Sequence, residues 1–466
     1  LATSADAAVA ADSGAKILDA SQTSLDSSTV DAAPAEAGMP ATSAKLKHLV
    51  VIYMENHSFD NLYGSWEGAG GLATSAATAT QTDPTASAPF STLPQTDPLI
   101  PLTLANKPYD ITQYLPANQA TAGDPVHRWY QEQAQINGGK MDLFAGVSNV
   151  KGMVMGYYPT ASLPVPTKLK SLGNKVTVLD HFFHAAFGGS FLNHIWLVAA
   201  ASPLFPNAPT TVAGFVAVED ANGKMVTDGV VTPDGYVVNT AQTINTPHAA
   251  SVEMHPEQKV PSQVIPTIGD RLIAKNIDFA WYSGGWDDAL AGHPDAKFQY
   301  HHQPLAYFQT FADGTDAKAK HLKDESEFFT ELAAGKLPPV SFVKPVGANN
   351  EHPQYADVIT GENHLNSLID AIMQSPTWSD TAVIITYDEN GGFWDHVAPP
   401  KTDKWGPGSR VPAIVISNFA KGGVDKTVYD TTAILKLIDE RWGTESLNAR
   451  VAGQASLLEH AFDFSK

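Results

Sequence analysis

Short apolar runs recur along the chain, and such runs are typical of strands buried on both faces of a sheet. The first is HLVVIYM at 48–54. Five more follow it along the chain: 176–183, 277–283, 340–346, 382–387 and 411–417. The pattern therefore predicts six strands.

Helical patterns separate these strands. In the clearest one, five apolar residues share one face of a helix: Leu365, Leu368, Ile369, Ile372 and Met373. Residues 434–442 repeat this pattern. Strands that alternate with amphipathic helices favour a parallel sheet, because each crossover lays a helix on one of its faces. We therefore predict an α/β fold, with a mainly parallel central sheet and helices on both faces.

Two segments interrupt this alternation. Residues 67–120 are rich in Ala, Thr and Pro, which is typical of a long surface excursion. Residues 207–240 carry Asn222-Gly223 and Asp234-Gly235 between β-prone runs, a strong signal for hairpins. We expect the second segment to form a small antiparallel β appendage, and both to be insertions in a single domain over 45–466.

The first 44 residues differ in composition from the rest. Residues 1–44 are mostly Ala, Ser, Thr and Asp with few large apolar side chains, so we expect a flexible leader. The chain opens at Leu1 and its start resembles the remainder of a removed export signal, which predicts an exported, periplasmic or secreted protein. A truncated sequence would begin in the same way.

Composition narrows the class of protein. The 466 residues are 43% hydrophobic and 17% charged, which excludes a disordered, coiled-coil or collagen-like chain. Lys and Arg number 29 and Asp and Glu 49, so the formal charge is −20 and nucleic acid is not expected as a partner. Because cysteine is absent, disulfides, zinc–thiolate sites and thiol nucleophiles are excluded. No apolar run reaches the roughly 18 residues of a membrane span.

Two predicted strands end in oxygen-bearing side chains. Glu55 and Asn56 follow the first strand, and Asp388 and Glu389 follow the fifth. In open α/β sheets, ligands bind beyond the carboxyl ends of the strands. Carboxylates gathered there repel one another unless a cation neutralises them, so these strand ends predict a metal site. Helix caps and turns are the alternative role for each residue.

A third strand leads into a candidate nucleophile. The run at 176–183 is followed by Gly188-Gly189-Ser190 and an apolar helical pattern at 191–200. This order places the Ser190 hydroxyl at a helix N-terminus, where free backbone N–H groups suit an oxyanion. An ordinary Ser N-cap is the alternative. The segment does not match the G-x-S-x-G turn, which argues against an α/β-hydrolase esterase.

Histidines supply the remaining candidates. The chain has 16 of them, and the best placed are His127, His301, His302 and His352. Imidazoles donate hydrogen bonds to phosphoryl oxygens, protonate leaving alkoxides and bind transition metals. A surface or structural role is the alternative for each one. Four further histidines are weaker candidates: His57, His194, His364 and His396.

Seven segments together carry a family resemblance: YMENHSFDNLYG, DPVHRWYQEQAQINGGKMD, GGSFLNHIWL, FQYHH, NEHPQY, TYDENGGFWDHVAPP and GPGSRVPAIVISNFAKGGVDKTVYDTTAILKLIDERWG. In this order they resemble the bacterial phosphoesterase family, which joins acid phosphatase A with the phosphatidylcholine-specific phospholipases C. The resemblance spans about residues 45 to 445. It implies an alkaline-phosphatase-like fold and metal-dependent hydrolysis of phosphate esters.

The resemblance also implies roles for individual residues. Glu55, Asn56, Asp388 and Glu389 look like the metal ligands of the family, Ser190 like its nucleophile and fifth ligand, and His127, His301, His302 and His352 like its phosphate-pocket histidines. The phospholipase branch often has Thr at the position of Ser190, and its larger members have a long C-terminal extension. Both differences favour an acid phosphatase that acts on phosphomonoesters.

These roles predict a mechanism. One divalent cation, with Ca, Mg, Mn, Zn and Fe all open, would activate Ser190 and a phosphoserine would form. His352 or His302 would protonate the leaving oxygen, and a His-lined pocket predicts an acid optimum. The substrate would be a small phosphate ester or a phospholipid head group. The alternatives are a phospholipase C and, from another class, a non-catalytic phosphate- or metal-binding protein.

Overall fold

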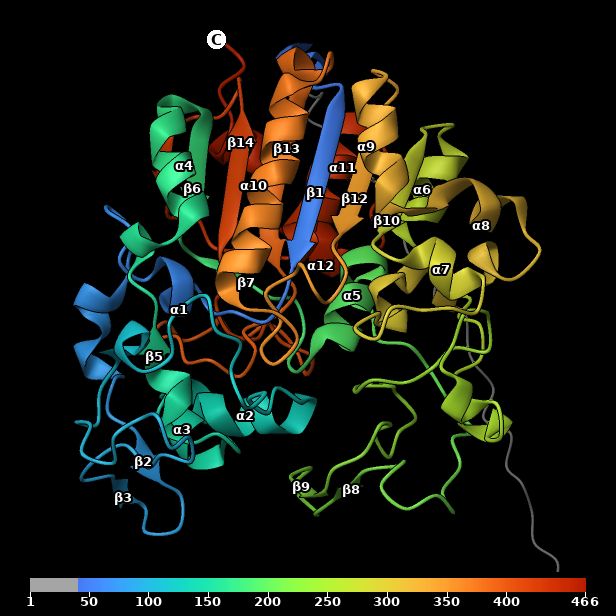
Figure 1. Ribbon diagram of the computed structural model, residues 1–466. Helices are drawn as coiled ribbons and strands as arrows, with labels where there is room; N and C mark the ends of the chain where they lie inside the picture. Colours follow the sequence, from blue (N-terminus) through green and yellow to red (C-terminus); the bar gives the residue numbers. More distant parts are fainter. Residues whose placement is uncertain (1–40) are drawn as a thin grey trace, which may run out of the picture. The chain divides into compact units, whose positions relative to one another are not determined.

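An eight-stranded sheet forms the core of the computed structural model, which describes residues 41–466 (Figure 1). Its strand order is β11-β10-β12-β1-β13-β14-β6-β15. The strands are β1 (His48–Met54), β6 (Val176–Leu179), β10 (Phe279–Ser283), β11 (Leu322–Asp324), β12 (Val340–Lys344), β13 (Thr381–Tyr387), β14 (Ala413–Ser417) and β15 (Gly423–Asp425). All six predicted strands are therefore present, and the short edge strands β11 and β15 were not predicted.

The sheet is mainly parallel, as predicted. β1 lies at its centre and pairs in parallel with β12 on one side and β13 on the other. Only β14, among the strands of this sheet, runs antiparallel to both of its neighbours. The central strands are buried along nearly their whole length, which is why their sequences are continuous apolar runs.

Helices cover both faces of the sheet (Figure 1). In this view α4, α9 and α10 lie in front of the sheet, and α11 lies behind it. The helices are α1 (Phe59–Tyr63), α2 (Trp129–Ile136), α3 (Phe144–Val147), α4 (Pro164–Leu172), α5 (Ser190–Ala199), α6 (Ile268–Ala274), α7 (Trp286–Leu290), α8 (Asp316–His321), α9 (Glu325–Ala333), α10 (Val358–Gln374), α11 (Thr432–Trp442), α12 (Ala449–Ala452) and α13 (Leu457–His460). The two helices with the clearest sequence pattern are α10 and α11, and both are present.

The remaining strands are short and lie outside the central sheet: β2 (Thr82–Asp83), β3 (Ala88–Pro89), β4 (Tyr109–Asp110), β5 (Gly156–Tyr157), β7 (Phe182–Phe183), β8 (Val218–Glu219), β9 (Met225–Thr227) and β16 (Tyr429–Asp430). The antiparallel β8–β9 hairpin is the regular part of the predicted appendage, and Asn222-Gly223 lies in its turn. The rest of that segment contains only isolated bridges.

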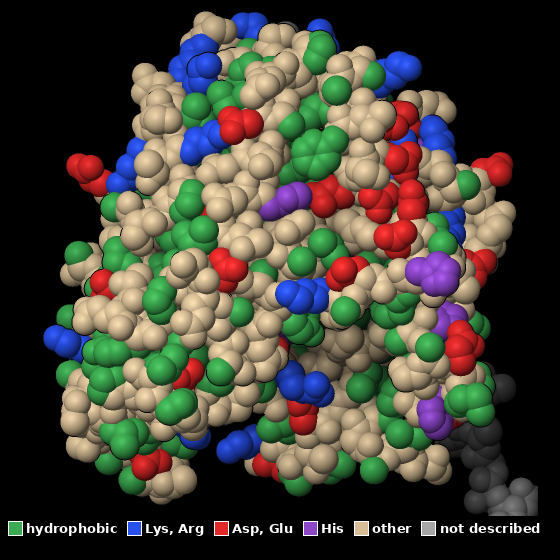
Figure 2. Space-filling model, in the orientation of Figure 1, with side chains coloured by type: hydrophobic (Ala, Val, Ile, Leu, Met, Phe, Trp, Pro, Cys, Tyr) green, Lys and Arg blue, Asp and Glu red, His purple; other side chains and the backbone are tan. Residues whose placement is uncertain are grey.

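The predicted leader lies mostly outside the described residues, apart from residues 41–45, which form a 3₁₀ helix (Ala41–Lys45). Within the described chain, no helix has both the length and the apolar character that crossing a membrane requires. On the face shown in Figure 2, basic side chains are scattered and acidic side chains gather on the right.

Candidate active site

Two acidic loops meet because their strands are neighbours. β1 and β13 pair in parallel over seven residues, from His48 opposite Thr381 to Met54 opposite Tyr387, so both chains leave the sheet at the same edge. The backbone N–H of Asn56 donates to Asp388 Oδ1 at 3.2 Å. Glu55, Asn56, Asp388 and Glu389 are all fully buried. The structure thus brings together all four predicted metal ligands.

The turn after β13 depends on a glycine at one position. Gly391 has φ +61, and a Cβ there would lie 2.1 Å from the backbone oxygen of Asn56. Only glycine, which has no Cβ, adopts this left-handed backbone conformation without strain and also allows the Asn56 oxygen to approach so closely. The Gly391 N–H donates to Glu389 Oε2, so the turn also orients the Glu389 carboxylate.

Ser190 approaches this cluster from a third strand end. It is the first residue of α5, and the N-cap is Gly189. The Ser190 hydroxyl donates to Asn56 Oδ1 at 3.3 Å. The alternative of an ordinary N-cap is therefore wrong, because the side chain faces the acidic loops instead of the backbone of its own helix.

The loop before Ser190 is held by a buried ion pair. Glu132 of α2 accepts hydrogen bonds from Gly188 N at 2.6 Å and from His184 Nε2 at 2.8 Å. His184 Nδ1 donates to Ala186 O at 2.8 Å, so both ring nitrogens face acceptors and the ring is an imidazolium. Burial alone would lower the pKa of His184, but Glu132 raises it above its ordinary value.

Two oxygens of the buried Asp388 and Glu389 carboxylates lack hydrogen-bond partners within residues 41–466. Asp388 Oδ2 and Glu389 Oε1 are buried and have no hydrogen-bond partner among the described residues. Burial, followed by the charge of Glu55, raises the pKa of Asp388 to about 6. Burial and then Asp388 raise the pKa of Glu389 well above its ordinary value. Buried carboxylate oxygens that lie close together without hydrogen-bond partners are suitable ligands for a divalent cation.

Sequence reasoning did not identify Lys344, which lies in the same cluster. This lysine ends β12 and is fully buried. Its Nζ lies 2.7 Å from Glu55 Oε1, and together with His302 it holds the pKa of Glu55 well below its ordinary range, although burial alone would raise it. Lys344 could have been identified from the sequence as a charged residue within the apolar run at 340–346.

Two predicted histidines direct Nε2 of the ring toward the site. His127 Nδ1 donates to Pro125 O at 2.6 Å, and His352 Nδ1 donates to Pro353 O at 2.7 Å. His127 Nε2 accepts a hydrogen bond from Asn56 Nδ2 at 3.4 Å. His352 Nε2 lies 3.7 Å from Glu55 Oε2.

The other two predicted histidines are deeper. His302 Nε2 lies 2.5 Å from Glu55 Oε1, so this ring faces a carboxylate and not the cavity. Burial lowers the pKa of His302 to about 4, and burial followed by the charge of His302 lowers the pKa of His301. That protonated imidazoles bind the anion stays a prediction.

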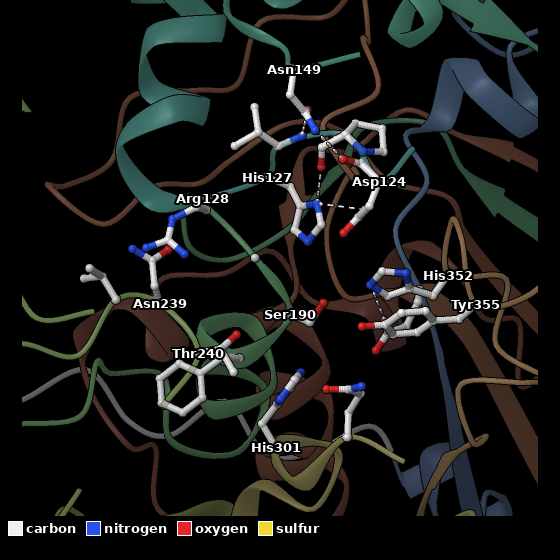
Figure 3. A pocket seen from close by; sticks show the side chains of 17 residues that line it. Asp124, His127, Arg128, Asn149, Ser190, Asn239, Thr240, His301, His352 and Tyr355 are labelled. Carbon is white, nitrogen blue, oxygen red and sulfur yellow. Dashed lines mark hydrogen bonds and ion pairs between the residues drawn. The ribbon is translucent and has the colours of Figure 1, made fainter. Parts of the chain in front are cut away.

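A cavity of about 320 Å³ opens over Ser190. His127, His301 and His352 line it, and in Figure 3 their rings surround the Ser190 side chain. Glu55 also lines the cavity, whereas Asn56, Asp388, Glu389 and His302 are not among its lining residues. The arrangement suits a ligand that reaches both Ser190 and the carboxylate cluster from the cavity.

Three of the four weaker histidine candidates have only structural partners. His57 and Asn61 Oδ1 are joined through Nδ1 at 2.6 Å, and His364 and His396 each pair with a carboxylate. His194 is different, because its Nδ1 donates to Ser190 O at 2.7 Å and its Nε2 has no partner among the described residues.

Comparison with known proteins extends this picture. An α/β fold with a buried cluster of carboxylates beside a serine defines a candidate metal-assisted hydrolase. Residues 46–445 match the Phosphoesterase family, which is most of the chain. The chain belongs to this family, and both the resemblance and the expected class, hydrolases of phosphoric esters, are confirmed at the level of the family.

Curated relatives include a non-hemolytic phospholipase C of Pseudomonas aeruginosa, 24% identical over 90% of this chain and 57% of its own length. Phospholipase C B of Mycobacterium tuberculosis is 24% identical over 91% of this chain and 79% of its own length. The chain thus spans little more than half of the first relative. A solved alkaline phosphatase superfamily protein from Vibrio parahaemolyticus is 13% identical over 77% of this chain and 75% of that chain, with a TM-score of 0.35.

Proposed function

We propose that this chain hydrolyses phosphate esters with the aid of one divalent cation and with Ser190 as the nucleophile. Phosphomonoesters are the main proposed substrate class, which makes the protein an acid phosphatase. The observation that carries the proposal is the Ser190 hydroxyl, 3.3 Å from Asn56 Oδ1 at the edge of the buried carboxylate cluster.

The proposed ligands of the cation are Glu55, Asn56, Asp388, Glu389 and Ser190. When bound, a divalent cation lowers the pKa of an alcohol and neutralises charge on phosphoryl oxygens. Its identity is open among Ca, Mg, Mn, Zn and Fe, because the nearest ligands are oxygens and histidines lie close by.

The residues around the cavity would act as nucleophile, as ligands of the phosphoryl oxygens and as proton donor. Ser190 Oγ attacks phosphorus from the helix N-terminus, and the bond to the leaving oxygen breaks as a phosphoserine forms. His127, His301 and His352 bind the phosphoryl oxygens. Of the two proposed proton donors we favour His352, because its Nε2 is available beside the cavity, whereas His302 Nε2 contacts Glu55.

A phospholipase C is the second candidate function. The curated relatives are named phospholipases C. One wall of the cavity also carries Asp124 and Tyr355, and Asp124 Oδ1, which lies 3.6 Å from His127 Nδ1, accepts no hydrogen bond from the described residues. A carboxylate beside an aromatic ring suits a cationic head group. We further propose an exported protein, in keeping with the predicted leader.

A paired assay tests both candidates. The purified protein is given p-nitrophenyl phosphate and, separately, p-nitrophenylphosphorylcholine, before and after treatment with EDTA. A phosphatase releases nitrophenol mainly from the monoester, a phospholipase C mainly from the diester, and EDTA abolishes either activity until a metal is restored. Phosphate or metal binding with no turnover of either substrate would contradict both and favour a binding protein.

A further inference from the structure

Lys344 is a buried cation within the proposed metal site. Its ammonium lies 2.7 Å from Glu55 Oε1 and 3.4 Å from Met54 O, and 5.5 Å above the ring of Tyr53. The side chain has no exposed surface. Burial of a charged lysine is strongly unfavourable unless a carboxylate lies beside it. Apolar packing therefore does not explain why a lysine occupies this position.

A second set of candidate metal ligands also includes Glu55. Glu55, His194 and His302 each offer one ligand atom, and these atoms lie within 4.8 Å of one another. The rings of His194 and His302 stack with their centroids 5.0 Å apart. One carboxylate with two imidazoles is a set that suits zinc and other first-row transition metals.

His194 provides an independent sign that this set is able to bind an ion. Its Nδ1 donates to Ser190 O at 2.7 Å, so Nε2 carries the lone pair. That Nε2 is buried and has no hydrogen-bond partner among the described residues. Unpartnered imidazole nitrogens are rare in protein interiors and are the form in which histidine binds metals.

The charges show why Lys344 and a second ion exclude each other. Glu55, Asp388 and Glu389 are fully buried, and Lys344 offsets one of the three carboxylates. Two negative charges remain, which one divalent cation balances. A second divalent cation at the Glu55 oxygen would share its position with the ammonium and leave the buried cluster with excess positive charge.

We propose that Lys344 takes the place of a second metal ion and thereby limits the site to one. Glu55, His194 and His302 form a latent cation site, which the Lys344 ammonium blocks. If Lys344 is replaced by a neutral residue, this site opens, and His194 and His302 would each bind the ion through the ring nitrogen that carries no proton, while the other ring nitrogen keeps its proton. The inference rests on the proposed function, since the first ion is the one that it assigns to Glu55, Asn56, Asp388, Glu389 and Ser190, and Glu55 would then be shared between the two sites.

Metal stoichiometry tests the proposal without relying on activity. The wild type and Lys344→Met are stripped with a chelator, loaded with excess Zn²⁺ or Co²⁺ and desalted, and the metal per chain is measured by mass spectrometry. We expect one ion in the wild type and two in Lys344→Met. Visible absorption of the Co²⁺ form reports whether the added ion has histidine ligands.

Two more variants separate this role from a structural one. Lys344→Met with His194→Phe should return to one ion. Lys323→Met, which removes a lysine of the edge strand β11 of the same sheet, should keep one. Loss of the nearby positive charge should also tighten binding of the first ion by about tenfold or more. A purely structural lysine predicts the opposite, weaker binding of that ion.

The outcomes are distinct. A wild type that holds no metal contradicts the proposed function. A wild type with two ions, one of which is lost in His194→Phe, overturns the inference, as does a folded Lys344→Met that still holds one. If Lys344→Met does not fold, Lys344→Gln provides the same test, and the wild-type stoichiometry is decisive in either case.

Discussion

At the scale of single residues, the site depends on where the Ser190 side chain points. Ser190 begins α5 but does not cap it, and its hydroxyl instead donates to Asn56. A serine at the N-cap position would instead accept a hydrogen bond from a backbone N–H of the first turn. The free N–H groups of that turn are thus left for an anionic ligand of the cavity.

Ser190→Ala should lower kcat by about a thousandfold or more while the fold is kept, because the nucleophile is lost and the helix start needs no side chain there. Steady-state kinetics measure the loss, and circular dichroism checks the fold. The control is Ser171→Ala, which removes an exposed hydroxyl of α4. If Ser190→Ala retains a tenth of the activity, Ser190 is not the nucleophile.

At the scale of elements, the loops that carry the proposed catalytic residues are positioned by residues that have no sequence signature. Glu132 lies on α2, far in sequence from His184 and Gly188, which it binds. Arg410 is likewise buried and bridges Asp60 of α1 to Asp395 of the loop after β13. The first network attaches the loop before Ser190 to α2. The second attaches the loop after β13 to α1.

Glu132→Gln should lower the free energy of unfolding by about 3 kcal/mol, because the buried His184 imidazolium loses its partner. It should also lower kcat more than it changes KM, since the Gly188–Ser190 loop loosens. Chemical denaturation and kinetics measure these effects. Glu253→Gln, at an exposed ion pair with Lys259, is the control and should change neither.

The same ion pair predicts a pH window. Because the pKa of His184 is raised, this residue's contribution to the stability of the fold is complete below pH 6.5 and is lost as the pH rises through its folded pKa. Because the pKa of Glu132 is lowered, the contribution of Glu132 to stability is complete above pH 4.5 and is lost at lower pH. Activity should therefore fall on the alkaline side in the wild type and at a lower pH in Glu132→Gln. A profile that rises steadily through pH 8 would contradict this.

Elements differ in how far the sequence predicts them. The central strands were predictable because burial on both faces requires continuous apolar runs, as in β1 and β13. The edge strands β11 and β15 have three residues each, too few for any periodicity. The proposed ligands Glu55 and Asp388 were predictable because they follow long strands. Lys344 and Glu132 were missed, because their roles arise only from the packing of distant segments.

At the scale of the whole molecule, the sheet order brings the proposed site together. The proposed ligands follow β1 and β13, Ser190 begins α5, and Lys344 ends β12, which adjoins β1. The described residues form one compact unit. The domain boundary at residue 45 and the status of both insertions stay predictions.

Removal of metal should make the stability of the protein depend on pH. Raised carboxyl pKa values mean that the metal-free fold binds protons more tightly than the unfolded chain, so stability is lost as the pH rises through the folded values. For Asp388 this value is about 6. The chelated protein should melt at progressively lower temperature from pH 5 to pH 8, and the metal-loaded protein should not. Parallel curves for both forms would show that no ion balances these carboxylates.

The covalent intermediate provides the most direct test of the central claim, that Ser190 attacks phosphorus. The metal-loaded wild type is mixed with a phosphomonoester and quenched with acid within milliseconds, and its peptides are analysed by mass spectrometry. We predict one phosphoryl group on Ser190 that disappears as the substrate is exhausted. Rapid turnover with no phosphorylated peptide, or with the phosphoryl group on a histidine, would contradict the account.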